Sequence, residues 1–133
     1  MLKSLMRPRG MAVPLFALLA LAACQQDEIR ARGRAGGDLV SGVPAEIANC
    51  AAKKFDSETC GFLSACGTSV VNVTEGGAKA SVESRNGTVN LWVVDLAARQ
   101  GNIVEATYYM SADTQDRMAD VSRIVTSCAK PGP

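Results

Sequence analysis

The 133-residue chain contains no histidine. This absence excludes Ser-His-Asp triads and histidine-ligated metal centres, because both need an imidazole. A glycine-rich phosphate-binding loop is also lacking, since Gly76-Gly77 lies between two strand-like segments rather than before a helix. Three clustered acids, Asp113, Asp116 and Asp120, fit the solvated start of a helix better than a general acid and base. We therefore expect no catalytic residue, no metal site and no cofactor.

A hydrophobic run long enough to cross a membrane is lacking as well. The longest apolar stretch, residues 11–23, has 13 residues and contains Pro14, whereas a spanning helix needs about 20 residues. It follows a cationic start with Lys3, Arg7 and Arg9 and ends in small residues, which is typical of a removable export signal. The sequence therefore predicts a signal peptide over residues 1–23.

The end of this segment, Leu21-Ala22-Ala23-Cys24, resembles the lipobox of bacterial lipoproteins. The resemblance covers only the first 24 residues. It implies that Cys24 becomes the mature N-terminus and carries acyl chains, several of which make the anchoring effectively permanent. Gln25, rather than aspartate, at the second mature position implies the bacterial outer membrane, with the domain expected to face the periplasm. The alternative is an ordinary secretory signal in which Cys24 happens to follow two alanines.

The mature chain has few cations with which to hold a nucleic acid. After loss of the signal it carries 11 basic and 13 acidic residues, and no basic stripe with interleaved aromatics occurs, so a nucleic-acid partner is not expected. Only Arg30, Arg32 and Arg34 form a basic cluster. We interpret them as part of a solvated, flexible tether over residues 24–43, which would span roughly 24 Å as a coil. The alternative is contact with anionic lipid head groups.

Four cysteines follow Cys24, and an even number in an exported chain indicates two disulfides. They are Cys50, Cys60, Cys66 and Cys128. A zinc site would need closely paired cysteines, which gaps of 10, 6 and 62 positions do not provide. Of the three possible pairings we favour Cys50 with Cys128 and Cys60 with Cys66, because Cys50 and Cys128 lie on the apolar stripes of two predicted helices.

The segment 44–130 is predicted to be one small disulfide-stabilised α+β domain. Helical spacing of apolar residues predicts helices over about 44–55 and from Ser111 to about Cys128. Between them, four strand-like segments are separated by turn signals at Gly76-Gly77, Asn86-Gly87 and residues 100–102. We expect a two-layer domain, in which a four-stranded antiparallel meander packs both helices on its one apolar face.

The two glycine-containing hairpin turns also predict the strand register. They set Val71 opposite Val82 and Val82 opposite Leu91, so that one face becomes apolar. The expected apolar face holds Val71, Val73, Ala80, Val82, Val89, Leu91 and Val93, joined by Val104, Ala106, Tyr108 and Met110. The opposite face is mostly polar except for four residues that this register brings together: Trp92, Val94, Ile103 and Tyr109. We predict a binding surface there, with good strand formers on an open face as the alternative.

These features favour a non-enzymatic membrane-anchored lipoprotein that binds an envelope protein as an assembly or secretion accessory. The alternative is a periplasmic module that binds a small molecule or glycan, or inhibits an envelope enzyme, through the exposed sheet face. A small hydrolase is the least favoured reading.

Overall fold

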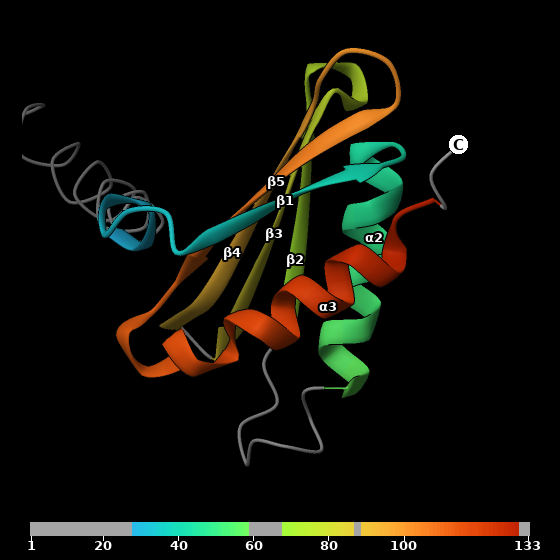
Figure 1. Cartoon of the computed structure of the whole chain (residues 1–133). Helices are drawn as coiled ribbons and strands as arrows, with labels where there is room; N and C mark the ends of the chain where they lie inside the picture. Colours follow the sequence, from blue (N-terminus) through green and yellow to red (C-terminus); the bar gives the residue numbers. More distant parts are fainter. Residues whose placement is uncertain (1–27, 59–67, 87–88, 131–133) are drawn as a thin grey trace, which may run out of the picture.

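The computed structural model describes residues 28–58, 68–86 and 89–130. Its elements are β1 (Gly36–Ser41), α2 (Pro44–Glu58), β2 (Thr68–Thr74), the 3₁₀ turn η3 (Glu75–Gly77), β3 (Lys79–Asn86), β4 (Val89–Ala98), β5 (Ile103–Met110), the 3₁₀ helix η4 (Ala112–Arg117) and α3 (Met118–Cys128). Within these residues, five strands form one antiparallel sheet in the order β1-β5-β4-β3-β2. Both α-helices cover the same face of the sheet (Figure 1). The predicted two-layer α+β fold is confirmed.

Both helices form where the spacing of apolar residues predicts them. Ile47, Ala51 and Phe55 of α2 recur every four residues and are buried, as are Val121 and Val125 of α3. Each helix thus buries one stripe against the sheet. The first helix runs three residues further than predicted, and the second begins as the 3₁₀ helix η4 before α3 starts.

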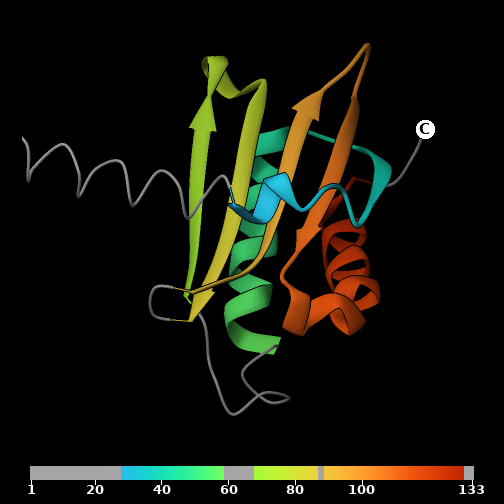
Figure 2. The ribbon, with the colours of Figure 1, turned by 90° about the vertical axis from the view of Figure 1, so that its left-hand side faces the viewer.

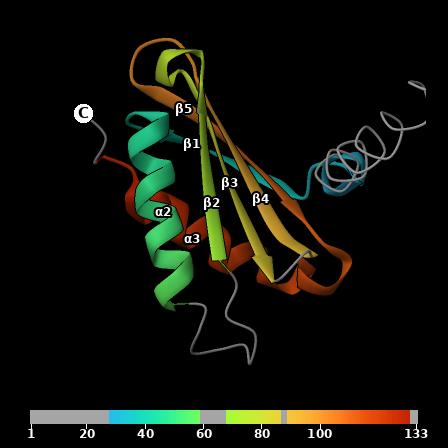
Figure 3. The same ribbon diagram turned by 180° about the vertical axis from the view of Figure 1, so that it is seen from behind.

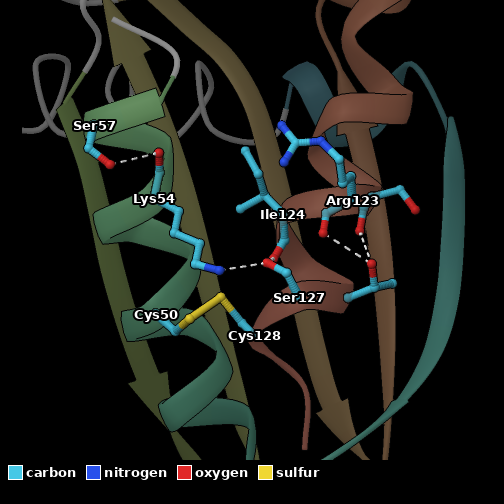
Figure 4. The surroundings of a disulfide bond; sticks show 9 residues. Cys50, Lys54, Ser57, Arg123, Ile124, Ser127 and Cys128 are labelled. Carbon is cyan, nitrogen blue, oxygen red and sulfur yellow. Dashed lines mark hydrogen bonds between the residues drawn. A yellow bond between two sulfur atoms is a disulfide. The ribbon is translucent and has the colours of Figure 1, made fainter. Parts of the chain in front are cut away.

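A disulfide between Cys50 and Cys128 joins α2 to α3. Their Cα atoms are 5.7 Å apart, and Figure 4 shows the bond between the facing helices. One turn along α2, Lys54 Nζ donates a hydrogen bond to Ser127 Oγ at 2.8 Å. The predicted pairing of Cys50 with Cys128 is confirmed.

Strand β1 comes from the segment that was predicted to be a flexible tether, and this prediction is wrong. Residues 36–41 pair with β5, with Val40 opposite Val104, so the sheet has five strands rather than four. Gly36 lies at a close approach to α3, because a Cβ atom there would be 2.5 Å from Met118 Sδ. The glycine that suggested flexibility therefore lies at a packed position, where a larger residue would displace the Met118 side chain.

A polar network holds β1 to the rest of the domain. Tyr108 of β5, 1% exposed, donates a hydrogen bond to Asp38 Oδ2 at 2.6 Å, and Ser122 of α3 donates to the same oxygen at 2.7 Å. Burial and the hydrogen bond to Asp38 raise the pKa of Tyr108 above its ordinary value, so its hydroxyl stays protonated and remains a donor. Asp38 thereby links β1 to both layers.

The first hairpin has the predicted register. Val71 lies opposite Val82, and Val73 lies opposite Ala80. The glycines of η3 have positive φ angles, 64° at Gly76 and 98° for its neighbour, as the tight connection requires.

The second hairpin does not have the predicted register. Val82 lies opposite Val94 rather than Leu91. Asn86 pairs with Val89, although it was predicted to lie in the turn, and a β-bulge between Ser84 and Arg85 adds an unpaired residue to β4. The partner of Val82 thus moves by three residues along β4, and a shift by an odd number exchanges the two faces of a strand.

The apolar pattern along β4 explains this exchange. Trp92, Val94 and Leu96 alternate as large apolar residues and are all buried in the core. The predicted face would have turned Asp95 into the core instead, where an unpaired carboxylate is strongly unfavourable. The Trp92 ring packs edge-on against Phe55 of α2, with ring centroids 5.5 Å apart.

Removing the helix-to-helix disulfide should measure its contribution to stability. For the Cys50→Ala, Cys128→Ala double variant we expect the free energy of unfolding to fall by about 2–4 kcal/mol, because the bond closes a loop with a sequence separation of 78 residues. Urea titrations measure this change. Lys54→Ala, which removes only the neighbouring hydrogen bond, is the control and should lower stability by about 1 kcal/mol or less. Equal losses in the two variants would contradict the prediction.

Candidate functional site

The sheet face opposite the helices carries an N-terminal strap, which we define as residues 28–35. Residues 28–31 form a helical turn that lies in front of the strands, with α2 and α3 behind them (Figure 2). Ile29 of this turn is 5% exposed, and the Ala35 N–H donates to the Tyr108 carbonyl oxygen at 2.8 Å. The strap is therefore part of the folded domain, and the interpretation of this stretch as a solvated linker is wrong.

Arg30 joins the strap to the sheet through a two-point ion pair. Its Nε and Nη2 atoms donate to Oδ2 and Oδ1 of Asp95 at 3.0 and 2.8 Å, and the two side chains are 29% and 35% exposed. The guanidinium carbon also lies 6.0 Å from the centre of the Tyr109 ring, at the outer limit of a cation–π contact. The hydrogen bond with Asp95 raises the pKa of Arg30, although burial opposes this, so the Arg30 side chain keeps its positive charge.

Below the strap, the sheet face contains a small buried patch. Val93 is 0% exposed and Glu83 is 2% exposed, and the two lie opposite each other on β4 and β3. Tyr109 lies opposite Val93 on β5, and Asp95 follows Val93 by two residues on β4. Arg30 contacts both of these neighbours of Val93. Ile29 of the strap is itself buried, and the removal of its apolar side chain from water stabilises docking of the strap.

A groove of about 440 Å³ hollows the same face, and we call it the open-face groove. Asn72, Ser81 and Asp95 lie directly opposite one another on β2, β3 and β4 and form a polar row along it. The charged residues of its lining are Arg30, Lys79, Asp95 and Arg99. The groove thus has three cations and one carboxylate.

The outer cations of the groove remain accessible to another anion. Lys79 Nζ lies 3.3 Å from Glu75 Oε1, and Arg99 Nη2 lies 2.8 Å from Glu105 Oε2, but the Lys79 and Arg99 side chains are 58% and 56% exposed. Ion pairs this exposed contribute only ~0–1 kcal/mol each. An incoming anion can share or replace such partners, and the neutral polar row supplies further hydrogen bonds.

The predicted aromatic binding surface does not form. Trp92 is 2% and Val94 is 0% exposed, because the face of β4 is exchanged. Ile103, 45% exposed, and Tyr109 do lie on the open face, but they are six residues apart on β5, which separates them by about 20 Å. The four residues are not brought together, so this site prediction is wrong.

Three predicted site residues, Cys24, Cys60 and Cys66, lie outside the described residues. Lipidation of Cys24 and the pairing of Cys60 with Cys66 stay predictions. In the part of the chain that the structure describes, no group of three or more histidine, cysteine, aspartate or glutamate side chains could hold a metal ion. Nor does any helix of that part have the length and apolar character to cross a membrane.

Sequence reasoning missed the residues that shape the open-face groove. Arg30 and Asp95 are 65 positions apart, and no local pattern joins residues at that separation. One signal was present: the alternation of Trp92, Val94 and Leu96 turns Asp95 to the face opposite the core. Its partner on the strap could still not be named.

No protein-family model, curated protein or solved structure matches this chain.

Loss of the ion pair should loosen the strap without unfolding the sheet. In Arg30→Ala, we expect the free energy of local opening to fall by about 1 kcal/mol, so amide hydrogen exchange over residues 28–35 becomes about fivefold faster. Arg32→Ala is the matched control, because Arg32 is exposed and lies two positions further along the strap. Mass spectrometry measures the exchange. Equal exchange rates over residues 28–35 in the two variants would contradict a role of the Arg30–Asp95 ion pair in holding the strap.

Proposed function

We propose that the chain is a non-enzymatic lipoprotein of the bacterial envelope, held by acyl chains on Cys24, whose domain binds an envelope protein as an assembly or secretion accessory. The lipobox resemblance supports export and anchoring, and the outer membrane is the expected location. The Cys50–Cys128 disulfide supports the same compartment, because such bonds persist mainly in oxidising environments. The domain would then face the periplasm.

The observation that carries protein binding is the open edge of β2. Among the described strands, β2 lies at one end of the sheet order and pairs only with β3, and it forms one margin of the sheet in Figure 2. Its sequence, TSVVNVT, has no charged residue and no proline, although proteins commonly use both to protect exposed edges. Val70 and Val73 are 40% and 47% exposed. An edge of this composition is suited to pairing with another chain.

The direction of one N–H group indicates which main-chain donors face the edge. The Ser69 N–H donates a hydrogen bond to Asp56 Oδ1 of α2 at 2.9 Å, and α2 runs along the same side of the molecule as β2 (Figure 3). Alternate residues of a strand direct their N–H groups toward the same edge. The Val71 and Val73 N–H groups therefore point away from β3, where an extended partner segment could add a sixth strand.

The anchor and the partner edge can be tested in one set of strains that express the full chain. We expect wild type in the membrane fraction and crosslinked to a partner protein, and Cys24→Ala released from the membrane. Val73→Pro should stay in the membrane but lose the crosslink at least tenfold, because proline removes one edge N–H group without removing a bond to β3. Val73→Thr keeps that donor and should crosslink like wild type.

Two results would count against the proposal separately. Membrane retention of Cys24→Ala would overturn the anchor. Equal crosslinking of the Val73→Pro and Val73→Thr variants would overturn the β2 edge as the partner site.

A further inference from the structure

We propose that the open-face groove binds the phosphate head groups of anionic lipids, so that the open face of the sheet lies against the membrane carrying the anchor. The proposal rests on the proposed lipidation of Cys24. It adds a second membrane contact, made by the folded domain, and it assigns the two sheet faces different surroundings.

The length of chain between the anchor and the strap limits how far the domain can lie from the lipid. Cys24 precedes Glu28 by four residues, and four residues span at most about 14 Å when fully extended. The strap itself is fixed, since Ile29 is buried and Arg30 is paired with Asp95. Because the strap crosses the open face and both helices lie behind the sheet (Figure 2), the open face is the one nearest the membrane.

The charges of this face complement an anionic head group. Arg30, Lys79 and Arg99 surround the groove, and the carboxylates paired with Lys79 and Arg99 are displaceable at this exposure. The strap carries two further exposed cations, Arg32 and Arg34. Guanidinium and ammonium groups form strong charge-assisted hydrogen bonds with phosphate oxygens. Basic residues clustered near a membrane anchor are attracted to anionic lipids.

The neutral and apolar residues of this face fit the same ligand. Asn72 and Ser81 can donate hydrogen bonds to phosphate or glycerol oxygens from within the groove. At the other margin of the sheet, Leu39 is 72% exposed and Ile103 is 45% exposed, and both lie on the open face of the β1–β5 pair. Exposed apolar side chains beside cations are typical of surfaces that rest on a lipid interface.

Lysine acylation of the full lipidated protein tests this arrangement with an internal control. The protein is incorporated into vesicles of phosphatidylcholine alone or with phosphatidylglycerol, and flotation with the vesicles is measured first. Lys79 in the groove and Lys53 on the exposed side of α2 are then compared in each sample. We expect phosphatidylglycerol to slow acylation of Lys79 about fivefold relative to Lys53, the factor appropriate for one cation at an anionic surface.

Two charge-matched variants extend the test. Arg99→Gln should remove most of the Lys79 protection, whereas Lys130→Gln, on the exposed end of the helical side, should leave it unchanged. If phosphatidylglycerol changes the acylation rates of Lys79 and Lys53 by the same factor in a protein that floats, the groove proposal is overturned and the anchor is left intact. Protection by soluble glycerol phosphate in vesicles of phosphatidylcholine alone would assign the groove to a free ligand and overturn the membrane contact. A protein that does not float would overturn the anchor and the groove proposal together.

Discussion

The ion pair between Arg30 and Asp95 joins the first described residues of the chain to the sheet. It holds a strap of eight residues onto a sheet face that would otherwise be open, and it does so from a side chain that had been interpreted as part of a solvated linker. Ile29 of the strap is buried, and the chain enters β1 directly after the strap. Since Cys24 lies only four residues before the strap, the proposed anchor and the domain are closely coupled rather than separated by a long tether.

The two faces of the sheet are stabilised by different physical means. The helical face contains the main apolar core, closed by the Cys50–Cys128 disulfide and by the packing of Trp92 against Phe55. The open face relies on polar rows and ion pairs, and its small buried patch of Val93 and Glu83 lies beside the residues that Arg30 contacts. A domain of this size has a limited core, so covalent and polar links contribute a substantial part of its stability. The open face is accordingly the part that can exchange partners.

Local patterns predicted much of the fold, whereas contacts between distant segments set the remainder. Helical spacing and the Gly76-Gly77 turn predicted both helices and the first hairpin, because each depends on neighbouring residues. Strand β1 was missed because its glycines indicated flexibility, whereas they lie close to Met118 and to the Ala106 carbonyl oxygen, both far along the chain. The binding surface was wrong because a bulge exchanged the faces of β4, and the pattern Trp92-Val94-Leu96 would have revealed this. The groove depends on Arg30 meeting Asp95, which no local pattern encodes.

The central claim is that the strap holds the open face of the sheet close to the anchoring membrane. Neutron reflectometry on the lipidated protein in a supported bilayer measures the distance between the head groups and the protein layer. Docking of the strap predicts protein density that begins within about 14 Å of the head groups, because only four residues separate Cys24 from Glu28. A hydrated layer of roughly 24 Å between lipid and protein, as an undocked tether would give, would contradict it.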